Sequence, residues 1–399
     1  MTKDNSNTRT PIIRFQGFNG EWKKKKIGDI AIVLQGYGFP EKYQGQKYGD
    51  LPFCKVGDIS SAVDRGEMFI NKADNFVDYS LLPVLHAQPI PAGSTIFAKI
   101  GEAIRSNKRI RTGVPCLIDN NAAAVKSKGE ISDTFLFYLM SKVNLADYSG
   151  GIVPSVNKST IEAIDVLVPS SRDEQQKIAE CLEAIDQMIS AQNHKVESLK
   201  TNKKGLMQQL FPQPGATTPS LRFPGFTGDW QEKSFDGICH TITPPLKLQS
   251  SQYSSSGKFP IVDQSQTLIC GWTNDSSGLL RNTPYIIFGD HTCVLKYIDF
   301  PFIQGADGVK ILGSNKKDNS KFIYQLLLSN PVKQDGYKRH FSDLKEKMFL
   351  LPPTLEEQTK IAECLSSIDE IISVEESKVV SLKTHKKGLM QQLFPQPQK

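Results

Sequence analysis

The amino-acid sequence predicts an α+β protein in which two globular domains of mixed helix and strand are separated by two long helices that pair antiparallel as a coiled coil. Three observations predict this class. A 46-residue segment occurs twice, a shorter element precedes each globular block, and the repeated segment carries the apolar spacing of a coiled coil. The chain is therefore organised as a pseudo-twofold internal repeat.

The repeated segment covers residues 169–214 and 352–397, with 31 of 46 positions identical. The shorter element, R-F-x-G-F-x-G-x-W, runs from Arg14 to Trp22 and from Arg222 to Trp230. These repeats divide the chain into a disordered N-terminus (1–10), a first globular domain (11–168), a first helical segment (169–214), a second globular domain (215–351) and a second helical segment (352–399).

Each repeated segment has the signals of a long helix. Ser171 and Glu174 have the spacing of a capping box, and Thr354 and Glu357 repeat it. Apolar residues then alternate at intervals of four and three, the pattern of a coiled-coil seam. The seam residues are Ile178, Leu182, Ile185, Ile189, Val196, Leu199, Leu206 and Leu210, and in the second copy Ile361, Leu365, Ile368, Ile372, Val379, Leu382, Leu389 and Leu393.

Two seam positions are polar in both copies, Gln192 with Glu375 and Lys203 with Lys386. Such residues either fix the register of a coiled coil or are merely tolerated by a long helix. Acidic residues lie early in each helix and basic residues late. Antiparallel pairing brings the acidic half of one helix beside the basic half of the other, so antiparallel pairing is predicted.

The two globular blocks share an order of elements but little identity. Each has β-like runs, such as 94–100 and 284–288, then an apolar helix at 135–143 or 322–328, and a last strand before the capping proline. Residues 23–168 carry 18 basic and 15 acidic groups, and residues 231–351 carry 14 and 11, so each block is +3. One scaffold with two different surfaces indicates two different ligands of one kind.

The net charge of +6 and these basic blocks suit a polyanionic partner such as DNA, although a run of charge is equally typical of a solvated face. Arginine and lysine neutralise phosphates, and arginine also reads guanine in the major groove. The predicted DNA-binding residues are Lys99, Arg105, Lys108, Arg109 and Arg111 in the first block and Lys310, Lys316, Lys317, Lys338 and Arg339 in the second.

Motifs for chemistry are missing from the sequence. There is no P-loop and no dinucleotide fingerprint. Residues 282–285 (N-T-P-Y) only faintly resemble an adenine methyltransferase loop, and the cysteines and histidines between 239 and 293 lack the spacing of a zinc site. We therefore expect no catalytic, cofactor or metal residues in this chain. Polar first residues, no apolar run of a membrane span and seven cysteines without C-x-x-C predict a cytoplasmic protein.

The chain resembles the specificity subunits of Type I restriction-modification systems. The resemblance rests on two divergent blocks, each followed by a helix with E-Q-x-K-I near its start (Glu174 to Ile178, Glu357 to Ile361) and L-M-Q-Q-L-F at its end. It implies two target recognition domains that each read half of a split, asymmetric DNA site. It also implies helices that space the domains and bind two modification subunits. Those subunits bring S-adenosylmethionine for adenine methylation, and restriction subunits bring ATP and Mg²⁺.

The near-identical helix ends predict a surface for these partner subunits, because identity there exceeds what seam packing requires. The predicted interface comprises Leu206, Met207, Leu210, Phe211, Leu389, Met390, Leu393 and Phe394. Two other functions compete with this one. A coiled-coil adaptor would bind proteins instead of DNA, and a self-sufficient methyltransferase or nuclease would need the motifs that the sequence lacks.

Overall fold

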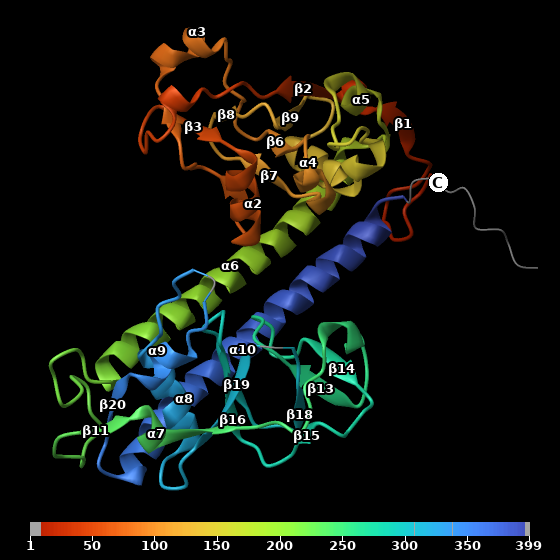
Figure 1. Ribbon diagram of the computed structural model, residues 1–399. Coiled ribbons are helices and arrows are strands. Elements are labelled where there is room, and N and C mark those ends of the chain that lie inside the picture. The colour runs from red at the N-terminus through yellow and green to blue at the C-terminus, as the bar shows by residue number, and fades with distance from the viewer. Residues whose placement is uncertain (1–8, 307, 337, 396–399) are drawn as a thin grey trace, which may run out of the picture. The chain divides into compact units, whose positions relative to one another are not determined.

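The computed structural model describes residues 9–306, 308–336 and 338–395 (Figure 1). Most of the predicted disordered segment, residues 1–10, lies outside the described residues. The chain divides into two compact units. Unit 1 comprises Met1–Val196 and Glu375–Lys399, and unit 2 comprises Glu197–Val374. Each unit therefore combines one globular domain with parts of both long helices, because α6 (Arg172–Leu210) and α10 (Leu355–Leu393) each pass from one unit into the other.

Unit 1 is built on two sheets. The larger sheet has the order β2-β9-β6-β7-β4 and the smaller sheet the order β5-β3-β8, in which β3 and β8 are parallel. The strands are β2 (Ala31–Gln35), β3 (Leu51–Cys54), β4 (Phe69–Ile70), β5 (Phe76–Val77), β6 (Thr95–Ala98), β7 (Arg109–Thr112), β8 (Leu117–Ile118) and β9 (Ala122–Ser127). A separate antiparallel pair, β1 (Lys23–Lys26) with β10 (Asp165–Val168), brings the two ends of the domain together. The helices are α1 (Ile27–Ile30), α2 (Val56–Asp64), α3 (Leu82–Leu85), α4 (Asp133–Lys142) and α5 (Lys158–Ala163).

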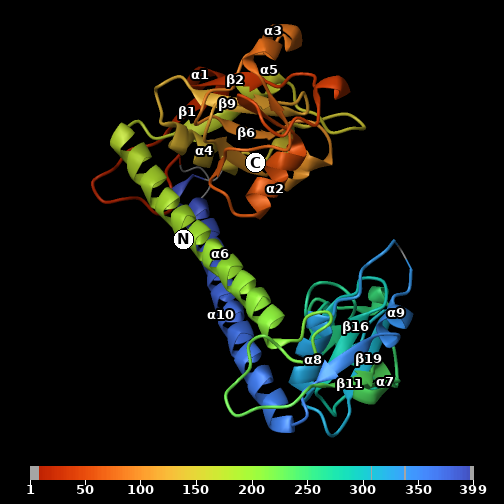
Figure 2. The same cartoon turned by 90° about the vertical axis from the view of Figure 1, so that its left-hand side faces the viewer.

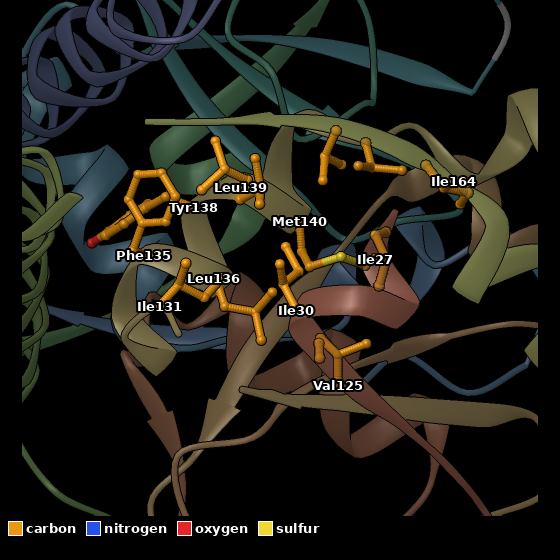
Figure 3. Packing of buried hydrophobic residues seen from close by; sticks show 14 of the residues in the cluster. Ile27, Ile30, Val125, Ile131, Phe135, Leu136, Tyr138, Leu139, Met140 and Ile164 are labelled. Atoms are coloured by element: carbon orange, nitrogen blue, oxygen red, sulfur yellow. The ribbon is translucent and has the colours of Figure 1, made fainter. Parts of the chain in front are cut away.

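Alternation along the strands gives the larger sheet of unit 1 two buried faces. Phe97 and Ala123 belong to the core that α4 covers, whereas Ile96 and Ala124 belong to the core beneath α2. Figure 2 shows α4 and α2 beside this sheet. The α4 core contains Phe135, Leu136, Tyr138 and Met140 from the helix itself (Figure 3). Ser132 begins α4 by accepting a hydrogen bond from the amide of Phe135 at 3.1 Å.

Unit 2 repeats this arrangement with different residues. Its sheets have the orders β12-β19-β16-β17 and β14-β13-β18-β15, and β13 and β18 are again parallel. The strands are β11 (Gln231–Ser234), β12 (Cys239–Ile242), β13 (Phe259–Val262), β14 (Gly271–Thr273), β15 (Leu279–Leu280), β16 (Tyr285–Gly289), β17 (Leu295–Ile298), β18 (Phe302–Gln304), β19 (Val309–Ser314) and β20 (Met348–Leu351). The helices are α7 (Phe235–Ile238), α8 (Ser320–Ser329) and α9 (Phe341–Lys345). Asn319 caps α8 as Ser132 caps α4. The expected α+β class with a repeated mixed domain is confirmed.

Within unit 1, the N-terminal part of α6 and the C-terminal part of α10 run antiparallel. The Lys386 ammonium contacts both carboxylate oxygens of Asp186, at 2.6 and 2.7 Å. Gln192 donates to the Glu375 carboxylate, which also accepts from Lys195 at 3.0 Å. These contacts confirm the predicted antiparallel pairing in this unit and give the polar seam positions specific partners.

Within unit 2, the other parts of the same helices form the corresponding pairing. The Lys203 ammonium contacts both carboxylate oxygens of Asp369 at 2.7 Å. Lys203 and Asp369 occupy the repeat positions of Lys386 and Asp186, so the same ion pair is formed once in each unit. Although α6 and α10 are each 39 residues long, no helix in the part of the chain that the structure describes is apolar enough to cross a membrane.

The R-F-x-G-F-x-G-x-W element attaches each domain to its helix. In unit 1, Arg14 donates to both carboxylate oxygens of Glu174 at 2.7 and 2.8 Å, and the Trp22 indole N–H donates to the same carboxylate at 3.3 Å. Arg222, Trp230 and Glu357 repeat this geometry in unit 2. We call these two constellations the anchors.

The anchors correct the predicted capping boxes. The Glu174 amide does bond to the Ser171 hydroxyl at 3.4 Å, which is the first half of a capping box. The Glu174 carboxylate, however, accepts from Arg14 and Trp22 instead of reaching back to the start of the helix. A buried carboxylate is stabilised more by a bidentate guanidinium than by one backbone amide. Glu357 behaves in the same way in unit 2.

Candidate nucleic-acid interface

We call the globular domains of unit 1 and unit 2 domain 1 and domain 2. In domain 1, polar side chains lie at one end of the larger sheet, which we call its loop end. Gln35 is the last residue of β2, Lys99 follows β6, and Asp119 follows β8. The Lys99 ammonium donates to the Gln35 side-chain oxygen, and the Lys99 amide donates to the Asn121 carbonyl at 2.8 Å. Partial burial lowers the pKa of Lys99 and raises the pKa of Asp119. The two neighbouring sheets therefore present a donor and an acceptor side by side.

Two loops reach this loop end. The first connects β2 to β3 through residues 36–50, and its start lies here, where Tyr37 forms a β-bridge with Asp119. Its later part, which holds Lys47 and the 86% exposed Tyr48, lies beside β5, where Lys47 donates to the Asp74 carbonyl at 3.3 Å. The second comprises residues 149–156 and lies against the end of β6, where the Gly101 amide donates to the Pro154 carbonyl at 2.8 Å. Exposed aromatic and cationic side chains on loops are typical of nucleic-acid contacts.

Domain 2 has a corresponding loop end with a different chemistry. Asp290 and His291 follow β16, and Lys310 lies near the start of β19. The segment between α8 and α9 packs here, because the His340 amide donates to the Asp290 carbonyl at 2.7 Å and the His291 ring bonds to the Lys338 carbonyl at 3.1 Å. This segment exposes three cations, Lys333, Lys338 and Arg339. The corresponding segment of domain 1, residues 149–156, contains no lysine or arginine, so the two loop ends differ in the charge of this segment.

Six of the ten predicted DNA-binding residues lie at or beside these loop ends. One is Lys108, which directly precedes β7, and the other five are Lys99, Arg105, Lys310, Lys338 and Arg339. Arg105 lies in the 3-10 helix after Lys99, and its exposed guanidinium pairs with Glu102 at 2.9 Å. Lys310 is half-buried, with its ammonium 5.3 Å from the centre of the Phe341 ring. Contact of these six residues with DNA stays a prediction.

Arg109 and Arg111 are wrongly placed by the sequence analysis, since both are interior residues of β7. Arg109 is 7% exposed and donates to the Val143 carbonyl at 2.7 Å, and its burial lowers its pKa to about 9. Arg111 is 4% exposed, pairs with Glu183 of α6 at 2.6 Å and lies over the Phe69 ring. Strand alternation turns both side chains toward α4 and α6. They hold domain 1 together and offer no surface to DNA in this structure.

Lys108, Lys316 and Lys317 are exposed or half-buried. Lys108 directly precedes β7 and lies beside Ala98 of β6 in the sheet register, so it belongs to the loop end of domain 1, whereas Lys316 and Lys317 lie away from the loop end of domain 2. Lys108 pairs with Asp64 at the end of α2, at 2.7 Å. Lys316 and Lys317 lie in the turn after β19, where neighbouring Asn315 bonds to Gly237 and Asp318 bonds to Gln358 of α10. This turn is at the opposite end of the sheet from Lys310.

Comparison with known proteins decides the family of this chain. The model of the Type I restriction modification DNA specificity domain matches twice, over residues 19–201 and 227–384. The chain belongs to this family. Each match takes in one globular domain and most of the long helix that follows it, so the internal repeat is a repeat of the specificity domain.

Relatives and solved structures agree with this assignment. Two specificity subunits from Methanocaldococcus jannaschii are similar over the whole chain. The Type I restriction enzyme MjaVIII subunit is 24% identical and the putative MjaX subunit 25%, each covering 94% of this chain and 92% and 93% of its own length. The crystal structure of the Type-I system S subunit from M. genitalium has the same fold, with a TM-score of 0.63 at 15% identity over 98% of this chain and 100% of its own. A structure described as showing complex assembly of the type I R-M system gives a TM-score of 0.50 at 16% identity, over 94% and 97% of the two chains.

The helix ends of this specificity chain have an internal role that the sequence analysis did not predict. Four of the eight predicted partner-interface residues, Leu210, Phe211, Leu393 and Phe394, are buried in the domain cores. Phe394 packs on Trp22, with ring centroids 5.7 Å apart, and Phe211 packs on Trp230 at 6.1 Å. These four side chains present no surface to a partner in this structure. The two helix ends have the same sequence because each completes the core of one globular domain: the end of α6 in unit 2 and the end of α10 in unit 1.

The remaining four, Leu206, Met207, Leu389 and Met390, are half-buried against the same cores. Binding of a partner subunit by their exposed parts stays a prediction. A carboxylate that was not among the predicted residues joins each globular domain to both long helices. Asp186 accepts from Tyr138 of α4 at 2.7 Å and from Lys386, and Asp369 accepts from Gln325 of α8 at 2.9 Å and from Lys203. Its recurrence at repeat positions 186 and 369 was the available signal.

Proposed function

We propose that this chain is the non-catalytic specificity subunit of a Type I restriction-modification complex, in which each domain reads one half of a split, asymmetric DNA site. The observation that carries the proposal is one scaffold present twice with the same anchors and different loop ends. A scaffold that is kept while its loops diverge is suited to reading two different sequences. The different loop ends imply that the two half-sites differ.

Other subunits supply the chemistry in this proposal. Two modification subunits bind S-adenosylmethionine and methylate adenine in each half-site, and restriction subunits use ATP and Mg²⁺ for cleavage. This chain binds none of these cofactors. It acts in the cytoplasm, where its DNA substrate lies and where the seven free thiols of the chain stay reduced.

The test is DNA binding and turnover measured on two samples, the isolated chain and the chain assembled with modification subunits. We expect the complex to bind one bipartite sequence at least a thousand-fold, as an order of magnitude, more tightly than random DNA, with affinity that falls steeply as salt rises. The isolated chain should transfer no methyl group and cleave no DNA. Turnover by the rigorously purified chain would overturn the non-catalytic assignment, and a complex without sequence preference would favour a protein-binding adaptor.

A further inference from the structure

The loop over residues 149–156 carries an apolar tip that the domain core does not use. Ile152 is 104% exposed and Val153 is 60% exposed. Two adjacent β-branched apolar side chains in water cost hydrophobic free energy that a soluble domain avoids unless the surface has a use. Ile12 and Ile13 are another adjacent exposed pair in domain 1, but they lie beside α10, where the Ile13 amide donates to the Gln392 carbonyl at 3.0 Å. Other exposed apolar residues, such as Ile32 and Val84, are single positions. Ile152 and Val153 are therefore available for contact with a ligand.

The base of this loop is firmly built. The Val156 amide donates to the Lys99 carbonyl at 2.9 Å, and the Gly101 amide donates to the Pro154 carbonyl at 2.8 Å. Gly150 and Ser155 bridge the two arms of the loop by mutual backbone hydrogen bonds of 3.3 Å. Gly151 has a φ of +89°, a backbone conformation that a residue with a side chain rarely adopts. The tip is held out from the surface by its own backbone.

The surroundings of the tip indicate the class of its ligand. The loop joins the β6 end beside Lys99, and the exposed guanidinium of Arg105 lies in the next turn of the chain. In domain 2, the segment that packs against the corresponding end of β16 exposes Lys333, Lys338 and Arg339. Equivalent places on a repeated scaffold serve the same kind of partner, and three cations at one of them favour a polyanion. Nucleic acid can bind both segments, because its phosphates pair with the cations of domain 2 and its bases can pack on the apolar tip of domain 1.

We propose that Ile152 and Val153 contact the bases of the half-site read by domain 1, so that this half is recognised partly through apolar contact. Apolar side chains read DNA by packing on the thymine methyl group in the major groove, or by wedging between base pairs in the minor groove. Both modes bury the tip against a base without neutralising a phosphate. The inference rests on the proposed function and adds to it the means by which one half-site is read.

The test is the variant Ile152→Ser in the chain assembled with modification subunits, with Ile32→Ser as a matched control. Ile32 is an exposed isoleucine of β2 that pairs with Lys126, away from the loop end. We expect Ile152→Ser to weaken binding to the specific DNA about tenfold, since a contact of this size is lost. Binding to random DNA and the slope of affinity against salt should stay unchanged, because no phosphate contact is removed. Ile32→Ser should leave all three quantities unchanged.

Two further arms separate the modes of contact. Replacement of thymine by uracil in the half-site should mimic Ile152→Ser if the tip packs on a methyl group. Fluorescence of 2-aminopurine in the half-site should fall on Ile152→Ser if the tip unstacks a base step. Unchanged specific affinity of Ile152→Ser, or equal loss on specific and random DNA, would overturn the inference. Loss of assembly with the modification subunits would do so as well, since it would assign the tip to a protein. Failure of the proposed function would differ from these results, because the unchanged complex would already lack sequence preference.

Discussion

Domain 1 and domain 2 are the same scaffold with two different loop ends. Both have a larger sheet, a smaller sheet with one parallel pair, a helix capped by a serine or asparagine, and an anchor of arginine, tryptophan and glutamate. Their loop ends differ in kind. Domain 1 presents Lys99 beside Gln35 and an apolar tip, whereas domain 2 presents Lys333, Lys338 and Arg339. Residues that hold a domain on its helix have thus been kept, and residues that face outward from the sheet have diverged.

The strongest test of the shared scaffold is removal of the anchor carboxylates. Glu174→Ala leaves the largely buried guanidinium of Arg14 and the Trp22 indole without their acceptor, and Glu357→Ala does the same to Arg222 and Trp230. We expect each variant to destabilise its own unit by about 3 to 5 kcal/mol. Hydrogen exchange during chemical unfolding reports which unit opens.

The matched control is Glu162→Ala, which removes an exposed carboxylate paired with Lys158 at 3.7 Å and should change stability by less than about 0.5 kcal/mol. If Glu174→Ala and Glu357→Ala lower the free energy of unfolding of their units by very different amounts, the two anchors are not energetically equivalent. The claim that the two domains share one scaffold would then be contradicted.

Arg111 distinguishes the two units, because the described residues of domain 2 contain no buried arginine on a strand paired with a helix carboxylate. Arg111→Met breaks the pair with Glu183 and the contact with Phe69, so it should destabilise unit 1 by about 3 kcal/mol and leave unit 2 unaffected. Calorimetry with domain-resolved hydrogen exchange measures both. Equal loss of stability in unit 2 would show that the units do not unfold separately.

Arg339 should behave in the opposite way to Arg111. Its exposed side chain lies beside the Lys338–Asp343 ion pair, so Arg339→Gln should change the free energy of unfolding by less than about 0.5 kcal/mol. In the assembled complex it should reduce the slope of log affinity against log salt by about 1, as expected for one lost phosphate contact. An unchanged salt slope would remove Arg339 from the DNA interface.

The smallest expected effect concerns the one polar seam position where the two helices differ in charge. Glu375 accepts from Gln192, Lys378 and Lys195, and these contacts lower the pKa of its carboxyl from 4.5 to about 2. A depressed folded-state pKa adds stability above the ordinary pKa, and this stability is lost as pH falls from about 4.5 toward 2. Glu375→Gln should therefore show a shallower loss of stability in that range. An identical acid profile for the variant and the parent would contradict this contribution.

Local patterns predicted the parts of the molecule that are determined locally. Apolar spacing of four and three predicted both long helices, because a seam repeats every few residues, and the order of acidic and basic residues along each helix predicted their antiparallel pairing. The predicted capping role of Glu174 failed because Arg14, 160 positions earlier, competes for the same carboxylate. Arg109 and Arg111 were predicted to contact DNA from their charge, but only the fold shows that they lie on β7 and that Glu183 of α6 pairs with Arg111.

Long-range contacts also explain what the sequence missed at the loop ends. Loop 149–156 meets Lys99 and Gly101 only after β6 and the connection following α4 have been brought together. The exposure of Ile152 could therefore not be inferred from its neighbours in the chain. Phe211 and Phe394 were predicted to face a partner because local spacing does not show their packing on a tryptophan. Phe211 packs on Trp230, which follows the helix, and Phe394 packs on Trp22, near the other end of the chain.

The central claim is that the two domains read their half-sites independently on one scaffold. Exchange of residues 23–168 for the corresponding block of a relative keeps both anchors and replaces the sheets, short helices and loop end of domain 1. Methylation-aware sequencing of DNA from cells that carry the exchanged complex then reads both half-sites at once. The account predicts that one half of the methylated sequence changes and the other half stays as it was. A change in both halves, or in neither, would contradict it.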